Sequence, residues 1–167
     1  MCDPHHRRSR ALKLGQVVSH REAQALVERA KLFEFVKGLV DAPKVKIATG
    51  SGRVVKGHIE AQLEAAGWAC PVKIDPTQNT DLNALHQASR TVLQVQTGNI
   101  ARAFYDLMKM QSLHQQNRAA CGVLILPSAT AARTIGGNLA NFDRVQEELG
   151  TLYFHQVTIP VLLISFE

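Results

Sequence analysis

Two glutamines stand two positions apart in the segment TVLQVQTGN. Residues 91–95 are rich in β-formers and predict a strand, and side chains two apart on a strand point to the same face. Gln94 and Gln96 therefore share a face just before Thr97-Gly98-Asn99 turns the chain into a helix. Two interpretations are open: the wet face of an edge strand, or a strand end that presents two side chains into a cleft.

A glycine-rich loop, Gly50-Ser51-Gly52, precedes several basic side chains. Backbone amides in such a loop and at a helix N-terminus favour anions. The spacing does not match nucleotide motifs: a Walker sequence ends in Gly-Lys-Ser/Thr where this chain has Lys56-Gly57-His58, and Val55 fills the third glycine position of a dinucleotide fingerprint. Contact of Arg53, Lys56 and His58 with a nucleic-acid backbone is the functional interpretation, and a surface turn is the alternative.

Carboxylates that could hold a metal ion are sparse. Asp75 and Asp81 lie in a polar segment before the two glutamines, and Glu60 and Glu64 stand four apart on one face of a predicted helix. A solvated surface pair is the simpler interpretation of these two glutamates. The sequence contains no Gly-x-Ser-x-Gly, His-Glu-x-x-His or Cys-x-x-Cys motif. Cys121 falls in an apolar run that is typical of a buried side chain.

The elements that must position these residues alternate along the chain. Apolar residues at steps of three and four predict helices over residues 20–40, 56–66, 100–115 and 139–149, the first opened by a Ser-x-x-Glu capping box. Apolar or β-branched runs predict strands over residues 44–48, 91–95, 121–126 and 157–166. Residues 68–74 are predicted to be extended and residues 75–84 to be a loop. This order predicts an α/β fold with a mixed central sheet flanked by helices.

Length and composition place these elements in one domain. The chain has 167 residues, of which 46% are hydrophobic, enough for one core. Residues 1–16 are basic and lack an apolar period, which predicts a flexible tail before a single domain over residues 17–167. The apolar runs are too short to span a bilayer, no signal-peptide pattern is present, and three widely spaced cysteines suit a reducing cytoplasm.

Positive charge is concentrated in the first third of the chain. Residues 1–56 carry twelve Lys and Arg against five acids, whereas residues 57–167 carry seven against nine. A basic region on an otherwise near-neutral domain indicates an anionic partner, with nucleic acid first among the candidates. The alternative is a cationic protein with no such partner.

The segments QVQTGN, YDLMKM and GVLILP follow one another in an order similar to the core of type II restriction endonucleases of the BglII and BamHI group. In that group an acid is followed by Glu-x-Gln or Glu-x-Glu on a strand, a glycine-containing turn, a helix with Asp-Leu and Lys, and a buried strand ending in Pro. The upstream GSGRVVKGHIEAQLEAAGW resembles the group's glycine loop and helix. The resemblance covers about residues 50–127.

The resemblance implies a PD-(D/E)XK nuclease fold that hydrolyses duplex DNA with Mg²⁺, commonly as a homodimer. The helix over residues 20–40 is our candidate for a dimer face. It implies that Gln96 orients the attacking water, that the Val95 carbonyl binds metal, and that Gln94 stands where the group has its metal-binding Glu. The expected Asp, nine positions earlier, falls on Leu85, so the nearest acid, Asp81, becomes the principal metal ligand. The implied catalytic residues are Asp81, Gln94 and Gln96, the metal ligands Asp81, Gln94 and Val95, and the DNA contacts Arg53, Lys56, His58, Asn99 and Arg102.

Gln94 is neutral, whereas the glutamate that the group has at this position carries a full negative charge. Mg²⁺ is held mainly by carboxylates together with phosphate and water, so this set would bind Mg²⁺ weakly and impair metal-activated attack by water. Two functions stay open at this point: a DNA-binding nuclease, and a non-catalytic binding or assembly module on a decayed nuclease fold. An α/β domain unrelated to nucleases is the third alternative.

Overall fold

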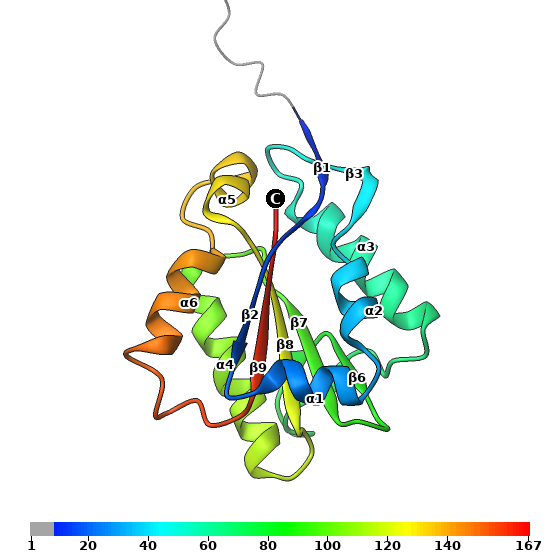
Figure 1. The fold of residues 1–167 in the computed structure, drawn as a ribbon, viewed down its shortest axis with the longest axis vertical. Coiled ribbons are helices and arrows are strands. Elements are labelled where there is room, and N and C mark those ends of the chain that lie inside the picture. Colours follow the sequence, from blue (N-terminus) through cyan, green and yellow to red (C-terminus); the bar gives the residue numbers. More distant parts are fainter. Residues whose placement is uncertain (1–8) are drawn as a thin grey trace, which may run out of the picture.

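A five-stranded mixed sheet forms the centre of the protein (Figure 1). The computed structural model describes residues 9–167. Strands β7, β8 and β9 run parallel to one another, and the edge strands β2 and β6 run antiparallel to their neighbours. The strand order is β2 (Leu14–His20), β9 (Val161–Phe166), β8 (Cys121–Pro127), β7 (Thr91–Val95) and β6 (Ala84–His86). The predicted mixed sheet is confirmed.

Helices cover both faces of this sheet (Figure 1). Side chains alternate along β7, so that Leu93 and Val95 enter one core and Val92 enters the other. The core around Leu93 packs against α1 (Ala23–Arg29), α2 (Phe33–Gly38) and α3 (Gly52–Ala65), while the core around Val92 packs against α4 (Ile100–Gln115) and α6 (Phe142–Gly150). The helices flanking the sheet therefore make the three-layer arrangement that the sequence predicts.

Smaller elements complete the fold. β1 (Arg10–Leu12) pairs with β3 (Ala42–Ile47), β4 (Val72–Lys73) pairs with β5 (Asp81–Leu82), and the short helix α5 (Ala129–Ile135) follows β8. Within residues 9–167, no helix combines the length and apolar content needed to cross a bilayer.

The tail predicted over residues 1–16 is wrong in its second half, because β1 and the start of β2 lie there. Residues 1–8 fall outside the described part of the chain. β2 is stabilised by backbone pairing with β9, about 145 positions away, and its own sequence, LGQVVSH, carries only a weak apolar pattern. Its pairing register shifts between Leu14 and Val17, which marks an irregularity near the start of this edge strand.

The helix predicted over residues 20–40 is two short helices. Lys31 adopts a left-handed backbone conformation, with φ of 59°, between α1 and α2, and the resulting bend lets Val27 and Val36 both reach the core. The predicted capping box is also wrong: Glu22 is itself left-handed, and the Ser19 hydroxyl accepts the N–H of Gln24 instead.

Other boundaries shift by a few residues. The predicted loop over residues 75–84 contains β5 and the first residue of β6, α3 begins four residues before its predicted start, and α6 begins at Phe142. The helix over residues 100–115 is confirmed, and Cys121 is buried as expected.

One buried glutamine ties α4 to the segment before β9. The side-chain oxygen of Gln111 accepts the backbone N–H groups of Thr158 and Ile159, both at 2.9 Å, and its Nε2 donates to the Thr158 hydroxyl at 2.8 Å. Ile159 is fully buried, so water cannot replace this acceptor there.

We expect Gln111→Leu to lower the free energy of unfolding by about 3 kcal/mol, since a stranded buried donor costs about 1–3 kcal/mol. Urea unfolding measures the change. The exposed Gln116, at the end of the same helix, provides the control, and Gln116→Leu should change stability by less than about 0.5 kcal/mol. Equal effects of the two substitutions would contradict the structural role assigned to Gln111.

Candidate functional site

A cleft of about 500 Å³ opens at the carboxyl end of β7, between the start of α3 and the start of α4. Its position agrees with the general tendency of α/β proteins to bind ligands beyond the carboxyl ends of parallel strands. The cleft brings together most of the predicted site residues: Arg53, Lys56, Asp81, Gln94, Val95, Gln96 and Arg102. Asn83, Thr97, Gly98, Tyr105, Asp106 and Lys109 complete its lining.

Two predicted DNA contacts lie outside this lining. His58 is on α3 and pairs with Gln62 at 2.7 Å. Asn99 caps α4, where its side-chain oxygen accepts the N–H of Ala101 at 2.9 Å. Both side chains therefore have local structural roles, and their contact with DNA stays a prediction.

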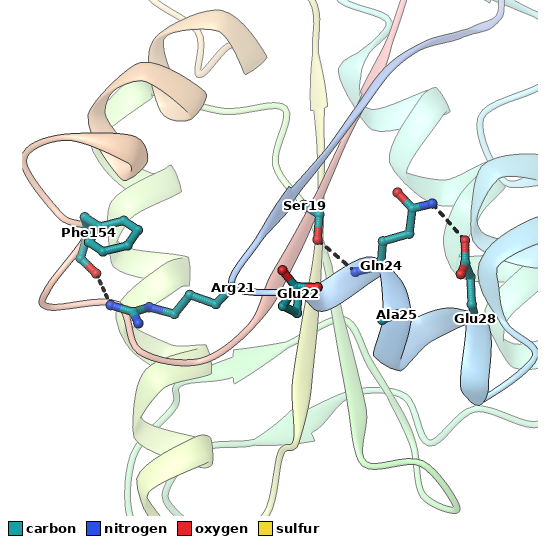
Figure 2. A pocket seen from close by; sticks show the side chains of 7 residues that line it. All are labelled: Ser19, Arg21, Glu22, Gln24, Ala25, Glu28 and Phe154. Atoms are coloured by element: carbon teal, nitrogen blue, oxygen red, sulfur yellow. Dashed lines mark hydrogen bonds between the residues drawn. The ribbon is translucent and has the colours of Figure 1, made fainter.

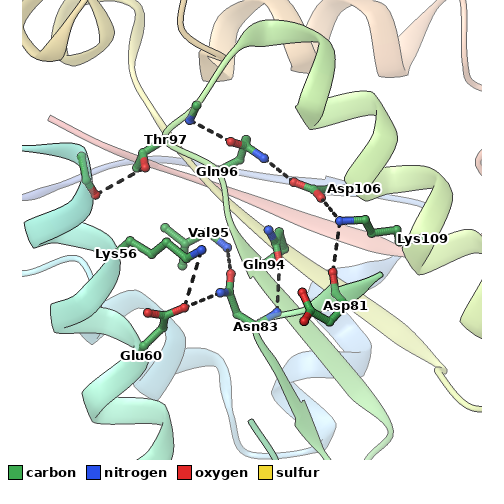
Figure 3. A network of polar contacts seen from close by, with 12 residues as sticks. Lys56, Glu60, Asp81, Asn83, Gln94, Val95, Gln96, Thr97, Asp106 and Lys109 are labelled. Atoms are coloured by element: carbon green, nitrogen blue, oxygen red, sulfur yellow. Dashed lines mark hydrogen bonds and ion pairs between the residues drawn. The ribbon is translucent and has the colours of Figure 1, made fainter. Parts of the chain in front are cut away.

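Asn83 links three elements at the floor of the cleft (Figure 3). Its side-chain oxygen accepts the N–H of Val95 at 2.8 Å, and its Nδ2 donates to the Glu60 carboxylate of α3 at 2.6 Å. The N–H of Asn83 donates in turn to Gln94 Oε1 at 2.9 Å. Lys56 lies 3.7 Å from the same Glu60 carboxylate. One asparagine thus fixes the position of Gln94, Val95 and Glu60 relative to one another.

Gln96 belongs to a second set of contacts, made with α4 (Figure 3). Its Nε2 donates to the buried Asp106 carboxylate, and its Oε1 accepts the N–H of Gly98 at 2.7 Å. Asp106 also binds Lys109 at 3.0 Å, and Lys109 donates to the main-chain oxygen of Asp81 at 3.1 Å. Only 2% of the Asp106 side chain and 13% of the Lys109 side chain are exposed, so this ion pair is largely shielded from water.

Glycine is required where the strand turns into α4. A Cβ on Gly98 would lie 2.8 Å from the Gln96 side-chain oxygen, inside contact distance, while its N–H donates to that oxygen. Gly52, the first residue of α3, approaches Thr97 so closely that a Cβ would lie 3.2 Å from the threonine side chain. The two glycines let the starts of α3 and α4 close around the end of β7.

Asp81 lines the cleft wall, but Asn83 is the residue bonded to Gln94 and Val95. The Asp81 carboxylate is 46% exposed and lies 3.8 Å from Lys73 Nζ. The assignment of Asp81 as principal metal ligand stays a prediction.

Sequence reasoning missed Asn83, Asp106 and Lys109 as members of the site. Asn83 falls in the segment predicted to be a loop, and nothing in its neighbours indicated the pairing of β6 with β7. Asp106 could have been identified, because it is a charged residue on the buried face of the helix that became α4. A buried carboxylate requires a partner, and the start of the helix returns toward the end of β7.

The donor set does not fit Mg²⁺, the ion that the resemblance to restriction endonucleases implies. Proteins bind magnesium mainly through carboxylates, whereas the floor of this cleft has the amides of Asn83 and Gln94. Of the nearby carboxylates, Glu60 is bonded to Asn83 and paired with Lys56, Asp106 is buried and paired with Lys109, and Asp81 is 46% exposed and lies 3.8 Å from Lys73 Nζ. Among residues 9–167 no cluster of three or more His, Cys, Asp or Glu side chains is placed to hold a metal ion.

A second hollow, of about 440 Å³, lies at the opposite end of the sheet, where β2 passes into α1 (Figure 2). Arg21 donates there to the carbonyl groups of Phe154 at 2.6 Å and Val157 at 3.0 Å, and its guanidinium lies 4.5 Å from the centre of the Phe154 ring. Gln24 donates to Glu28. These polar groups already bind one another, so the hollow has fewer of them available to a ligand than the cleft has.

Comparisons with known proteins agree with the fold. The family model described as restriction endonuclease BglII/BglIII matches residues 16–166. A crystal structure of restriction endonuclease BglII with a DNA 16-mer superposes with a TM-score of 0.71 at 14% identity, over 90% of this chain and 76% of that one. Free BglII superposes with a TM-score of 0.63 at 13% identity, over 90% and 77%. No curated protein sequence matches significantly.

Asn83→Asp tests the contacts at the cleft floor. The substitution keeps the acceptor for the Val95 N–H but places an oxygen against the Glu60 carboxylate, and two such groups cannot both ionise at this separation without raising one pKa. We expect the free energy of unfolding to fall by about 1–3 kcal/mol at pH 8 and by less at pH 5, where a shared proton relieves the repulsion. Urea unfolding at the two pH values measures the difference.

Adding Glu60→Gln to Asn83→Asp supplies a new amide donor and should restore most of the stability lost at pH 8. A double variant that is less stable than Asn83→Asp alone would show that the Glu60 contact with residue 83 is not what holds the cleft floor together.

His20, beside the second hollow, generates a pH prediction. Burial lowers the pKa of His20 below its ordinary 6.5, and the nearby Arg21 lowers it further, while the bond to the Val157 carbonyl opposes the shift. The unfolded chain therefore takes up a proton before the folded chain does, and stability is lost as the pH falls below about 6.5. We expect His20→Gln, whose amide can keep the bond to Val157, to lose less stability between pH 7.5 and 5.5. Equal losses in urea unfolding would contradict this.

Proposed function

Because the chain belongs to the BglII/BglIII restriction endonuclease family, we propose that it binds duplex DNA across the cleft at the end of β7 without hydrolysing it. The observation that carries the proposal is the pair of amides, Asn83 and Gln94, at the centre of a cleft walled by basic side chains. The family and the charge of the walls favour DNA as the ligand, and the amides argue against metal-dependent cleavage.

The charge of the cleft walls supports the DNA-binding part. Arg53 from α3 and Arg102 from α4 are exposed and make no side-chain hydrogen bond or ion pair with residues 9–167. Lys56 and Lys109 lie deeper, each beside a carboxylate. Free guanidinium groups at the rim can replace the counterions of the DNA backbone. The related crystal structure named above holds a DNA 16-mer, and its fold covers most of this chain.

The amides support the loss of hydrolysis. In-line attack on a phosphodiester by a metal-activated water needs a cation held beside the scissile group. Asn83 and Gln94 supply no charge to hold it, and Glu60 already binds an amide and a lysine. A catalytic role for Asp81, Gln94 and Gln96 with Mg²⁺ is the competing proposal, and metal-dependent cleavage would establish it.

Two further expectations belong to the proposal. The resemblance to restriction endonucleases implies a homodimer, which analytical ultracentrifugation of the full chain with and without DNA would test. The second expectation is a cytoplasmic location, which the few, widely spaced cysteines suggest.

A mobility-shift series with labelled duplex DNA at increasing NaCl tests the DNA interface. We expect salt-sensitive binding, and the removal of one phosphate-binding cation should reduce the slope of log K against log salt by about 0.9. Arg53→Ala and Arg102→Ala should each weaken binding and reduce this slope. Arg29→Ala removes an exposed arginine at the opposite end of the sheet and should have little effect. Failure of wild-type protein to bind at low salt would overturn the proposed function.

A plasmid-nicking assay on the same sample tests hydrolysis. Incubation with Mg²⁺ or Mn²⁺ should leave supercoiled DNA as intact as incubation with EDTA does. Nicking that requires the metal would contradict the loss of catalysis and would make Asp81 the first residue to replace.

A further inference from the structure

Backbone donors determine how the two amides at the cleft floor are oriented. The N–H of Val95 must point to the oxygen of Asn83, so the Asn83 NH₂ group faces the Glu60 carboxylate. The N–H of Asn83 must point to the oxygen of Gln94, so the Gln94 NH₂ group is the end left over. A carboxylate at either position could accept the same backbone hydrogen bond. Each amide thus places a donor where an acid would place a second charged oxygen.

The free end of Gln94 is available to a ligand. Gln94 Nε2 makes no hydrogen bond with residues 9–167, and Gln94 lines the cleft although only 7% of the residue is exposed. Lys109 lies on the α4 side of the same cleft, and its ammonium uses two of three N–H donors on Asp106 and the Asp81 carbonyl. An amide NH₂ and a partly satisfied ammonium form a donor set that matches phosphate oxygens.

The charge around the cleft now favours an anion. Four cationic side chains, Arg53, Lys56, Arg102 and Lys109, lie with three carboxylates, those of Glu60, Asp81 and Asp106. Acids at residues 83 and 94 would reverse this excess, and a phosphate could then approach only if a cation screened it. With amides in those places the repulsion is absent.

We propose that this cleft binds a DNA phosphodiester group directly, through Gln94 Nε2 and the ammonium groups of Lys56 and Lys109, with no divalent cation between protein and phosphate. The inference rests on the proposed DNA binding and adds how the phosphate is held. It makes affinity for DNA independent of divalent cations, and it assigns to Gln94 a role as a donor to the phosphate.

Fluorescence anisotropy with a labelled duplex at fixed ionic strength tests the independence from metal. The wild-type dissociation constant in EDTA should be within about twofold of that in Ca²⁺, or smaller, because divalent ions compete as counterions of the DNA. Binding that appears only in Ca²⁺ would overturn the inference while leaving the proposed DNA binding intact. Absence of binding in both buffers would instead overturn the proposed function.

Gln94→Glu tests the role of the amide. The glutamate keeps an oxygen for the N–H of Asn83 and replaces the free donor by a charged oxygen facing the phosphate. We expect binding in EDTA to weaken by about tenfold or more. Gln115→Glu makes the same charge change at the exposed far end of α4, more than 20 Å along the helix by the ~1.5 Å rise per residue, and should weaken binding by less than about twofold.

Thermal unfolding of both variants verifies that they are folded before binding is compared. Equal weakening by Gln94→Glu and Gln115→Glu would show that the cleft floor does not contact the phosphate and would overturn the inference. If Gln94→Glu does not fold, Gln94→Met, which removes the NH₂ donor and adds no charge, takes its place. Unchanged affinity of Gln94→Met in EDTA would then overturn the inference.

Discussion

Strand β7 is buried on both faces, so the polar groups at its carboxyl end must find their partners inside the protein. The N–H of Val95 projects beyond Ala84, the first residue of the antiparallel neighbour β6, so β6 offers it no backbone acceptor. The Asn83 side chain accepts it and thereby extends the ladder by one side-chain bond. The rest of the cleft floor follows from the placement of Asn83, since the same residue binds Glu60 of α3 and Gln94.

The same constraint explains why amides suit this place without a bound ion. A buried carboxylate is costly unless it is paired, and a set of two or three of them is stable only around a cation or a shared proton. Asn83 and Gln94 satisfy the same backbone donors and leave Glu60 with a neutral partner. On the α4 side, Asp106 is balanced by Lys109 and Gln96. Among the described residues, the Glu60 and Asp106 carboxylates are therefore each paired by side chains of the protein.

The sequence predicted the parts of the fold that rest on local patterns. Strands β7, β8 and β9 are long apolar or β-branched runs, and α4 has a clean helical period, so the sheet centre and its main helix could be recognised. β2 could not be recognised from its sequence, because it is stabilised by pairing with β9 at the other end of the chain. At the site, Gln94 and Gln96 could be identified from their spacing on a predicted strand. Asn83 was not, since its role depends on how β6 and β7 pair.

Neither edge strand of the central sheet offers a long, regular row of free backbone groups to which another strand could add. β6 has only three residues, and the pairing of β2 is irregular between Leu14 and Val17, near where the strand begins. Short and bulged edges are the means by which proteins keep exposed backbone groups from recruiting another chain. Strand-to-strand association of this protein along the edges of its central sheet is thus disfavoured.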